Sequence, residues 1–313
     1  MNNTKVGLDF GNGFVKLAIN GKASKIPAAY SVSMPTSLLS PTTGKPMKPK
    51  TFSLSYGEKT YWFGEAALRT GDSIREIDAH KFNDAEHIQI IFAAALANHV
   101  KAHKIDPEAW GRLSIATSLP PSAYADMPTR AKAIKAYEAA FAKRSAPWYV
   151  RSSIVDTFRI STEFAGMYQE AATLAQTMKL NRLTLFGDLG YGTLDLVLVD
   201  PRRIEPVFAK SFNVGLAHAF EKLNPINTDR AEYDLLTDAA ARSNLAAHFS
   251  TIKGKLSLAL RHAPGADLVL IGGGTKLMPP SVLSGFKAMA PTVRVMDEYS
   301  NARANEQATG LLI

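Results

Sequence analysis

Residues 9–13 are Asp-Phe-Gly-Asn-Gly, and residues 188–192 are Asp-Leu-Gly-Tyr-Gly. Both stretches follow one pattern of Asp, an apolar residue, Gly, any residue and Gly. Apolar, strand-like runs flank each copy: Val6–Phe10 and Phe14–Asn20, and Leu183–Gly187 and Thr193–Asp200. Glycine-rich turns between such runs are typical of β-hairpins. The sequence therefore predicts two related hairpins, one in each half of the chain.

This pattern is chemically suited to phosphate and a cation. Glycines let backbone N–H groups approach an anion without an intervening Cβ, and successive N–H groups of a turn form an anion-binding concavity. The carboxylates of Asp9 and Asp188 could hold Mg²⁺, which prefers oxygen ligands and keeps several waters. Lys16 could reach a phosphate as a point charge, and Thr193 and Asp195 add a hydroxyl and a second carboxylate.

A third glycine-rich stretch, Gly272-Gly273-Gly274-Thr275, follows the buried-strand pattern Ala266–Ile271. One reading is a backbone that lies close to a nucleotide; the other is a strand-to-helix turn that needs a positive φ. Together with the two hairpins, the triple glycine favours phosphate binding.

Other elements follow each hairpin. Strands are predicted at Thr51–Tyr56, Lys59–Phe63, Arg112–Thr117, Ile204–Phe212 and Val293–Met296, with β-branched runs in Trp148–Ile160. Helices are predicted at Ala85–His103, Ala123–Ala142, Thr162–Met178, Gly215–Leu223, Arg230–Ala247, Ser250–His262 and Lys276–Met289, and at the C-terminus. Strands come first and alternating helices and strands follow, twice, which predicts a duplicated α/β fold.

We expect two domains. Residues 1–160 would form the first, with a small β subdomain at about 31–75 and the C-terminal helix 302–313 packed back on it. Residues 161–301 would form the second. A chain of 313 residues with 46% hydrophobic content is long enough for two such cores.

Composition excludes several classes. The chain has no cysteine, which rules out disulfides, thiolate metal sites and a cysteine nucleophile. It has neither an N-terminal secretion signal nor an apolar stretch long enough to span a membrane, so we expect a cytoplasmic protein. The net charge of +8 fits either a solvated basic surface or direct contact with nucleic acid or another acidic polymer, and no nucleic-acid-binding motif decides between them.

Histidine and tryptophan give weaker signals. His99 and His103 are four residues apart on a predicted helix, which fits a surface pair better than a metal site, because no Glu pattern accompanies them. Trp62, Trp110 and Trp148 fit packing better than base stacking.

The three glycine-rich stretches resemble the phosphate 1, phosphate 2 and adenosine motifs of the superfamily that contains actin, Hsp70 and sugar kinases. Three further segments are similar to plasmid-partition actins of the ParM/StbA type and to archaeal actin-like proteins: Ile115–Pro120, Tyr61–Leu68, and Ala304-Asn305 with Gly310-Leu311. The resemblance implies an actin-like, ribonuclease H-like fold of two related domains, with a nucleotide in the cleft between them.

The resemblance also implies site roles. Asp9 and Asp188 would hold hydrated Mg²⁺, and Gly272, Gly273, Gly274 and Thr275 would line the nucleoside. The β- and γ-phosphates of ATP would be held by Gly11, Asn12, Gly13 and Lys16 on one side and by Gly190, Tyr191, Gly192 and Thr193 on the other.

In this family a glutamate at the start of the helix after the crossover positions the attacking water, and Glu163 is the matching position. A structural reading also stays open, because a glutamate at a helix N-terminus is a good partner for the helix dipole and resembles a capping-box residue. Glu163, Asp188 and Asp9 are thus the predicted catalytic residues.

Three functions remain open at this stage. The resemblance implies an ATPase that polymerises into filaments and segregates plasmid DNA through a DNA-binding adaptor. A small-molecule kinase of the sugar-kinase type has the same fold, but it needs a catalytic Asp in a substrate pocket, and no convincing candidate is present. A nucleotide-binding scaffold without hydrolysis is the third.

Overall fold

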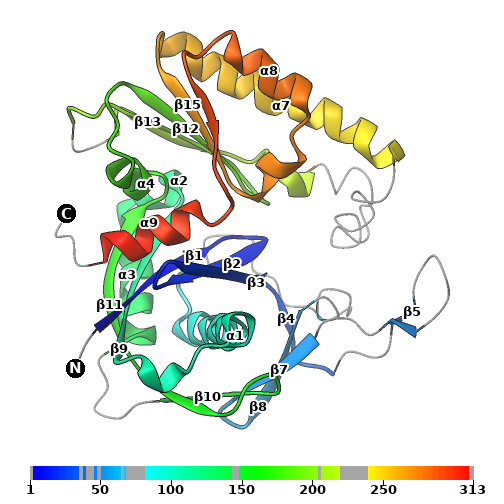
Figure 1. The fold of residues 1–313 in the computed structure, drawn as a ribbon, viewed down its shortest axis with the longest axis vertical. Helices are drawn as coiled ribbons and strands as arrows, with labels where there is room; N and C mark the ends of the chain where they lie inside the picture. The colour runs from blue at the N-terminus through cyan, green and yellow to red at the C-terminus, as the bar shows by residue number, and fades with distance from the viewer. Residues whose placement is uncertain are drawn as a thin grey trace. The chain divides into compact units, whose positions relative to one another are not determined.

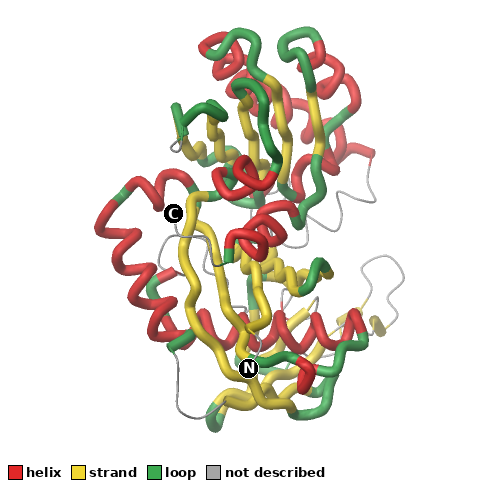
Figure 2. The backbone as a smooth tube through the Cα atoms, turned by 60° about the vertical axis from the view of Figure 1, so that its left-hand side comes forward, coloured by secondary structure: helices red, strands yellow, loops and turns green. Residues whose placement is uncertain are grey.

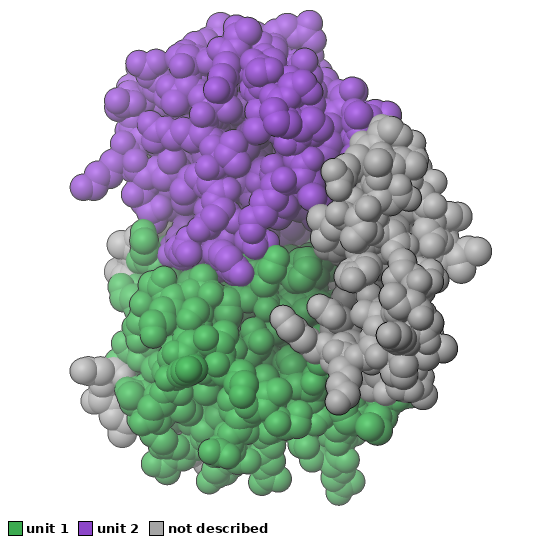
Figure 3. All heavy atoms as spheres, turned by 45° about the vertical axis from the view of Figure 1, so that its right-hand side comes forward, with its two compact units in different colours: residues 1–118, 128–167, 305–313 green, residues 119–127, 168–304 purple. Residues whose placement is uncertain are grey.

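The computed structural model describes residues 3–34, 38–39, 46–47, 51–64, 67, 82–142, 148–203, 206–218 and 239–309, and side chains of the last segment from residue 245. The chain divides into two compact units (Figure 3). Unit 1 comprises Met1–Ser118, Pro128–Met167 and Asn305–Ile313, and unit 2 comprises Leu119–Met127 and Tyr168–Ala304. The predicted domain boundaries at residues 160 and 301 stay a prediction.

A nine-stranded sheet, in the order β3-β2-β1-β9-β11-β10-β7-β8-β4, is built mainly from unit 1. Its strands are β1 (Asn3–Phe10), β2 (Phe14–Ile19), β3 (Lys22–Pro27), β4 (Tyr30–Ser31), β7 (Thr51–Tyr56), β8 (Lys59–Gly64), β9 (Arg112–Leu119), β10 (Trp148–Ser152) and β11 (Phe158–Gln169). β1 pairs antiparallel with β2 and parallel with β9. The predicted first hairpin and the predicted strands at 51–56, 59–63 and 112–117 are confirmed.

Helix α1 (Ala85–His103) forms the core of unit 1 and has the predicted bounds. Asp84 caps its start by accepting hydrogen bonds from the backbone N–H groups of Glu86 and His87. The helix is apolar on nearly all sides, and it packs against β2 and β3 and against β7 and β10 (Figure 1). Figure 2 likewise shows strands on both sides of this helix. A helix enclosed in this way buries its apolar residues on every face.

Unit 2 contains a five-stranded sheet in the order β14-β13-β12-β15-β16. The strands are β12 (Thr184–Leu189), β13 (Leu194–Val199), β14 (Phe208–Phe212), β15 (Asp267–Ile271) and β16 (Val293–Val295). β12 pairs antiparallel with β13 and parallel with β15, which repeats the β1, β2 and β9 arrangement. The predicted second hairpin is confirmed.

Helices cover both faces of this sheet. α7 (Ala239–His262) and α8 (Pro280–Lys287) pack together on one face (Figure 1), where Phe249, Leu256 and Phe286 are fully buried. α4 (Ala172–Thr177) and Ala304 of α9 (Ser300–Ala308) contribute to a second apolar cluster with Phe186, Val197 and Val269. The sheet is therefore apolar on both sides.

Several predicted helices are wrong in type or extent. The predicted helix Thr162–Met178 is a strand as far as Gln169, and only α4 within it is helical. The predicted break near residue 248 is absent, because α7 is continuous. A 3₁₀ turn, Gly273–Leu277, precedes α8, since Pro279 and Pro280 prevent one uninterrupted helix.

The other predicted segments are divided in the structure or only partly described by it. The predicted helix Ala123–Ala142 is divided at Asp126 into α2 (Pro121–Ala125) and α3 (Met127–Ala140). About half of the predicted subdomain at 31–75 lies outside the described residues; within the described half, β7 pairs with β8, and β5 (Leu38–Leu39) pairs with β6 (Pro46–Met47). Residues 219–238 and the end of the C-terminal helix also lie outside them. Within the described part of the chain, no helix has the length and apolar character needed to cross a bilayer.

The prediction that His99 and His103 form a surface pair is wrong for His99, which is fully buried. Its Nδ1 shares a 2.9 Å hydrogen bond with Ser24 Oγ, and His103 Nε2 bonds the carbonyl of Ala23. No group of three or more metal-ligating side chains occurs among the described residues. Burial, followed by the charges of His103 and Lys22, lowers the pKa of His99 from 6.5 to about 3.

Neutral His99 makes the stability of the fold depend on pH. The unfolded chain takes up a proton below about pH 6.5 and the folded chain does not, so stability falls as pH falls through this range. From pH 7 to pH 5 the loss is ~2 kcal/mol. We expect the free energy of unfolding, measured with urea at pH 7 and pH 5, to fall by ~2 kcal/mol less in His99→Asn than in the wild type. His262→Asn, which alters an exposed histidine, should match the wild type; equal slopes in all three proteins would contradict the assignment.

Candidate functional site

The first hairpin buries the carboxylate of Asp9 at the end of β1. Asp9 is 3% exposed and lies opposite Lys16 in the β1–β2 register. Lys16 Nζ and Asp9 Oδ2 form a 2.9 Å ion pair. Gly11 has no room for a side chain, because an added Cβ would lie 2.9 Å from the carbonyl oxygen of Phe14. The turn thus requires glycine, and its carboxylate carries a positive partner.

Asn305 and the end of β9 support this hairpin. The Asn305 side chain donates to the carbonyl of Leu8 at 2.9 Å and to Ser118 Oγ at 3.0 Å. Thr117 lies opposite Leu8 in the parallel β1–β9 pair, and its buried hydroxyl has no hydrogen-bond partner among the described residues. Buried hydroxyl groups are normally bonded, which makes Thr117 Oγ1 a candidate contact for a ligand or water at this edge.

The second hairpin has the same register with different chemistry. Asp188 lies opposite Asp195 in the β12–β13 pair, and both are buried. Thr193 Oγ1 donates to Asp195 Oδ2 at 2.7 Å. The position that carries lysine in the first hairpin thus carries aspartate in the second. Like charges directly across a strand pair are unfavourable, so this half of the structure favours a cation.

The turn of the second hairpin is held by the segment that follows β14. The carbonyls of Gly190, Tyr191 and Gly192 accept hydrogen bonds from the backbone N–H groups of residues 215–217, at 2.7 to 3.2 Å. A Cβ on Gly215 would lie 2.3 Å from the backbone of Gly192. These contacts fix the peptide planes of residues 190–192, as an anion-binding turn requires.

The triple glycine passes directly over this hairpin. Gly272 has φ of 90°, and a Cβ there would lie 2.2 Å from Asp188 Oδ1. A Cβ on Gly274 would lie 2.5 Å from the side chain of Leu189, and Thr275 Oγ1 bonds the carbonyl of Gly272. The positive φ of Gly272 agrees with the interpretation of this motif as a strand-to-helix turn. The close packing on Asp188 also places its backbone beside a predicted ion-binding carboxylate.

Lys276 follows the turn and pairs with the buried Glu298 at 2.6 Å. The hydrogen bond to Glu298 raises the pKa of Lys276, and partial burial opposes it. Glu298 Oε2 would lie 3.6 Å from a Cβ on Gly273. Glu298 therefore adds a carboxylate beside the third glycine-rich stretch.

The structure places Glu163 at the opposite end of β1 from the glycine-rich turn of the first hairpin. Glu163 lies within β11, where it accepts hydrogen bonds from Asn3 at 2.8 Å and Ser114 at 2.7 Å and pairs with Arg112 at 3.7 Å. Asn3 begins β1, and Asp9 lies six residues further along that strand, ~20 Å away. The helix start assumed for Glu163 is wrong, so its predicted catalytic role loses its structural basis.

Glu170 occupies the position expected of that glutamate. It follows β11 directly, precedes α4, and is 8% exposed. Its backbone N–H donates to the carbonyl of Leu119, the last residue of β9. Sequence analysis missed Glu170 because the predicted helix began too early. The signal was present: Glu170-Ala171-Ala172 follows Phe158–Tyr168, which is rich in aromatic and β-branched residues.

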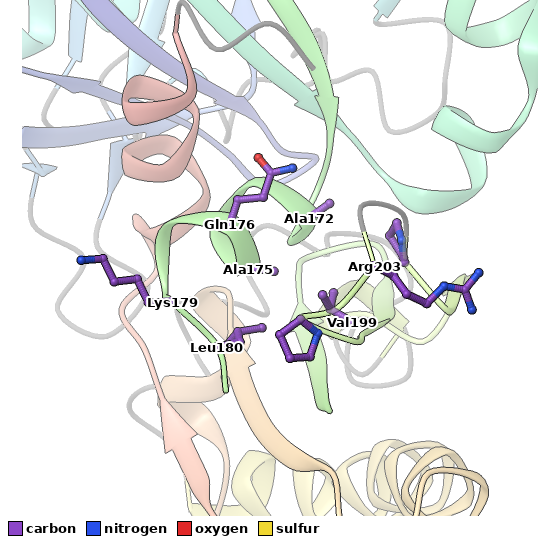
Figure 4. Close-up of a pocket in the computed structure, with 9 residues that line it drawn as sticks. Ala172, Ala175, Gln176, Lys179, Leu180, Val199 and Arg203 are labelled. Atoms are coloured by element: carbon purple, nitrogen blue, oxygen red, sulfur yellow. The ribbon is translucent and has the colours of Figure 1, made fainter. Parts of the chain in front are cut away.

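A pocket of about 200 Å³ lies elsewhere in unit 2 (Figure 4). It is formed by α4, the loop after it, and the β13–β14 connection; its lining includes Ala175, Lys179, Val199 and Arg203. Val199 ends β13, whereas Thr193 precedes that strand. The pocket is thus separated from the turn of the second hairpin by the length of β13, and none of the predicted site residues lines it.

Comparison with known proteins identifies the fold. Residues 7–157 match the family model of the N-terminal domain of actin-like proteins. Three similar solved structures cover almost the whole chain. They are apo pSK41 ParM (15% identity, 99% of this chain and 98% of that chain, TM-score 0.69), the archaeal actin homologue Ta0583 in complex with ADP (17%, 98% and 99%, 0.72), and the Alp12 filament (11%, 99% and 98%, 0.59). The chain has an actin-like fold.

These matches confirm the actin-like fold that the resemblance of the three glycine-rich motifs implied. None of the curated proteins is similar enough in sequence to count as a match. The roles of individual residues in the actin-like fold therefore stay predictions that depend on the geometry described above.

Gly272 gives a direct test of the close approach to Asp188. Gly272→Ala should destabilise unit 2 by more than Gly265→Ala, because both glycines have positive φ, 90° and 79°, but only Gly272 is crowded. Gly265→Ala should cost about 1–2 kcal/mol of unfolding free energy, the ordinary strain of a left-handed residue. Urea unfolding measures both values. Equal losses would show that space at Gly272 is not limiting.

Proposed function

We propose that this protein is a Mg²⁺-dependent ATPase whose hydrolysis is coupled to assembly into filaments. The observation that carries the proposal is the duplicated hairpin with opposite charge at the matching register, Asp9 with Lys16 and Asp188 with Asp195. One hairpin offers a cation for a phosphate, and the other offers carboxylates for a metal ion.

The fit to phosphate rests on the backbone. At Gly11 the backbone leaves no room for a Cβ. In the second turn, hydrogen bonds from residues 215–217 hold the peptide groups of residues 190–192 in place. Such turns bind anions through successive N–H groups. Lys16 would contribute its charge to the phosphates, and the turn at Gly272 would border the nucleoside. That Ta0583 was solved in complex with ADP supports the assignment.

The fit to Mg²⁺ rests on the donor set of unit 2. Asp188 and Asp195 are buried opposite one another, and the Thr193 hydroxyl lies against Asp195. Oxygen donors of this kind suit Mg²⁺. We propose that Asp188 is the main carboxylate for the ion and that Asp9 assists it, because Lys16 already neutralises Asp9. When bound, Mg²⁺ would neutralise the charge that develops on the phosphates.

Glu170 is the proposed residue for the attacking water. Glu170 is buried between the end of β11 and the start of α4, and a carboxylate held in this way can accept a proton or orient water. Glu163 already accepts two hydrogen bonds and an ion pair in unit 1, which is the environment of a structural residue.

Filament formation is proposed from the likeness to actin-like proteins, of which Alp12 was solved as a filament. A DNA-binding adaptor and plasmid segregation are extensions of the same proposal. The proposed ligands are ATP, Mg²⁺ and further copies of this chain.

The two glutamates form a matched pair for testing catalysis. Glu170→Gln should retain ATP binding and lower kcat 100-fold or more, as expected for loss of a general base. Glu163→Gln should retain kcat within about twofold. Phosphate release measured at saturating ATP decides between them. Normal turnover in Glu170→Gln together with a large loss in Glu163→Gln would restore the role assigned to Glu163.

Assembly is tested separately by light scattering and sedimentation with ATP, ADP and a slowly hydrolysed analogue. We expect ATP and the analogue to drive assembly and ADP to reverse it, because contacts to the γ-phosphate are lost on hydrolysis. Glu170→Gln assemblies should persist after ATP is supplied. ATP turnover without any assembly, stimulated instead by a small-molecule acceptor, would favour a kinase.

A further inference from the structure

Asn301, in the first turn of α9, contacts the predicted metal carboxylate of unit 2. Its Nδ2 donates to Asp188 Oδ2 at 2.6 Å across 113 residues of sequence. Asn301 is 5% exposed and Asp188 is 7% exposed. A carboxylate can only accept a hydrogen bond here, so the NH₂ group of Asn301 must face it.

The other half of the Asn301 amide is an acceptor. Oδ1 is buried and has no hydrogen-bond partner among the described residues. Because Oδ1 and Nδ2 belong to one planar group, the acceptor lies within a few ångström of the Asp188 carboxylate. Buried polar atoms are normally bonded, and an exception at a functional site indicates a ligand or ordered water.

Both oxygens of the Asp188 carboxylate have a close neighbour. Oδ2 receives the Asn301 hydrogen bond, and Oδ1 lies where a Cβ on Gly272 would be 2.2 Å away. Since a larger residue at 272 would occupy the space of Oδ1, the glycine and the asparagine together favour one orientation of the carboxylate. Held ligands of this kind bind metal more tightly than mobile ones.

Asn301 is itself firmly positioned. Ser300 directly before it bonds Asp297 through both its N–H and its hydroxyl, and Arg303 pairs with the Asp297 carboxylate. Ala302 and Ala304 are buried. The start of α9 is therefore anchored independently of Asp188, so the helix can impose an orientation on the carboxylate.

We propose that Asn301 is a positioning residue for the metal: its amide N–H fixes Asp188, and its Oδ1 accepts a hydrogen bond from a water of hydrated Mg²⁺. Mg²⁺ usually keeps several waters when it binds protein carboxylates, and such waters are donors. The inference rests on the proposed Mg²⁺–nucleotide site and adds a residue to it.

The test measures Mg²⁺ dependence of ATP binding by calorimetry, not turnover. In Asn301→Leu, which keeps the approximate size but loses donor and acceptor, the Mg²⁺ concentration for half-maximal enhancement should rise about tenfold or more, the usual effect of removing a group that orients a metal ligand. ATP binding in EDTA should stay within about twofold of the wild type.

Asn98→Leu is the control for a general loss of stability. It removes a side-chain hydrogen bond from Asn98 to a backbone carbonyl in unit 1 and should leave the Mg²⁺ dependence unchanged. Thermal melting in EDTA compares the stability of the variants. An equal shift in Asn98→Leu would overturn the proposal, because the effect would then follow from stability alone.

Asn301→Ala provides a second variant if the leucine prevents folding. It removes the amide donor and acceptor without adding bulk or charge beside Asp188 and Asp195, so the Mg²⁺ midpoint should rise as in Asn301→Leu. An unchanged midpoint would overturn the proposal.

The two levels of inference fail differently. If the wild type binds ATP with Mg²⁺ and Asn301→Leu has the same Mg²⁺ midpoint, the role of Asn301 is overturned and the proposed function stands. If the wild type binds no ATP under either condition, the proposed function is overturned, and the role of Asn301 with it.

Discussion

A carboxylate buried at the end of a central strand is the constraint on which each hairpin depends. Burying an ionised group is costly unless other groups compensate. Lys16 compensates Asp9 with a charge, and Asn301 contacts Asp188 with a neutral amide. Gly272 leaves space for the Asp188 carboxylate, and Gly11 leaves space for the Phe14 carbonyl in the turn beside Asp9. Much of the local sequence is thus explained by two buried acids.

The two hairpins share a register but differ in their electrostatics. The register is the same in both copies, but the residue opposite the aspartate is Lys16 in one and Asp195 in the other. Lys16 favours an anionic ligand, whereas the buried Asp188 and Asp195 pair favours a cation, so the two copies differ in the charge of the ligand that each suits. This difference in ligand preference arises from two side chains at the matching position, Lys16 and Asp195.

The segment 158–178 explains the main error of sequence analysis. Ser161-Thr162-Glu163 resembles a helix start, and the alanines at 171, 172 and 175 support helix locally. The chain instead continues as β11, because pairing beside β9 and β10 outweighs this local preference. Within β11, Glu163 accepts hydrogen bonds from Asn3 and Ser114 and pairs with Arg112. The glutamate that precedes the helix is instead Glu170.

Sequence by itself determined the parts of this protein that depend on local chemistry. Turn glycines between apolar runs gave both hairpins, and the apolar pattern after Asp84 gave α1 with its observed bounds. Tertiary structure alone decided which distant groups meet the carboxylates. Asn301 lies 113 residues from Asp188, and Gly272 reaches it only through the parallel pairing of β12 with β15. Such contacts leave no local signal, because they arise from strand order and helix placement and not from the spacing of neighbouring residues.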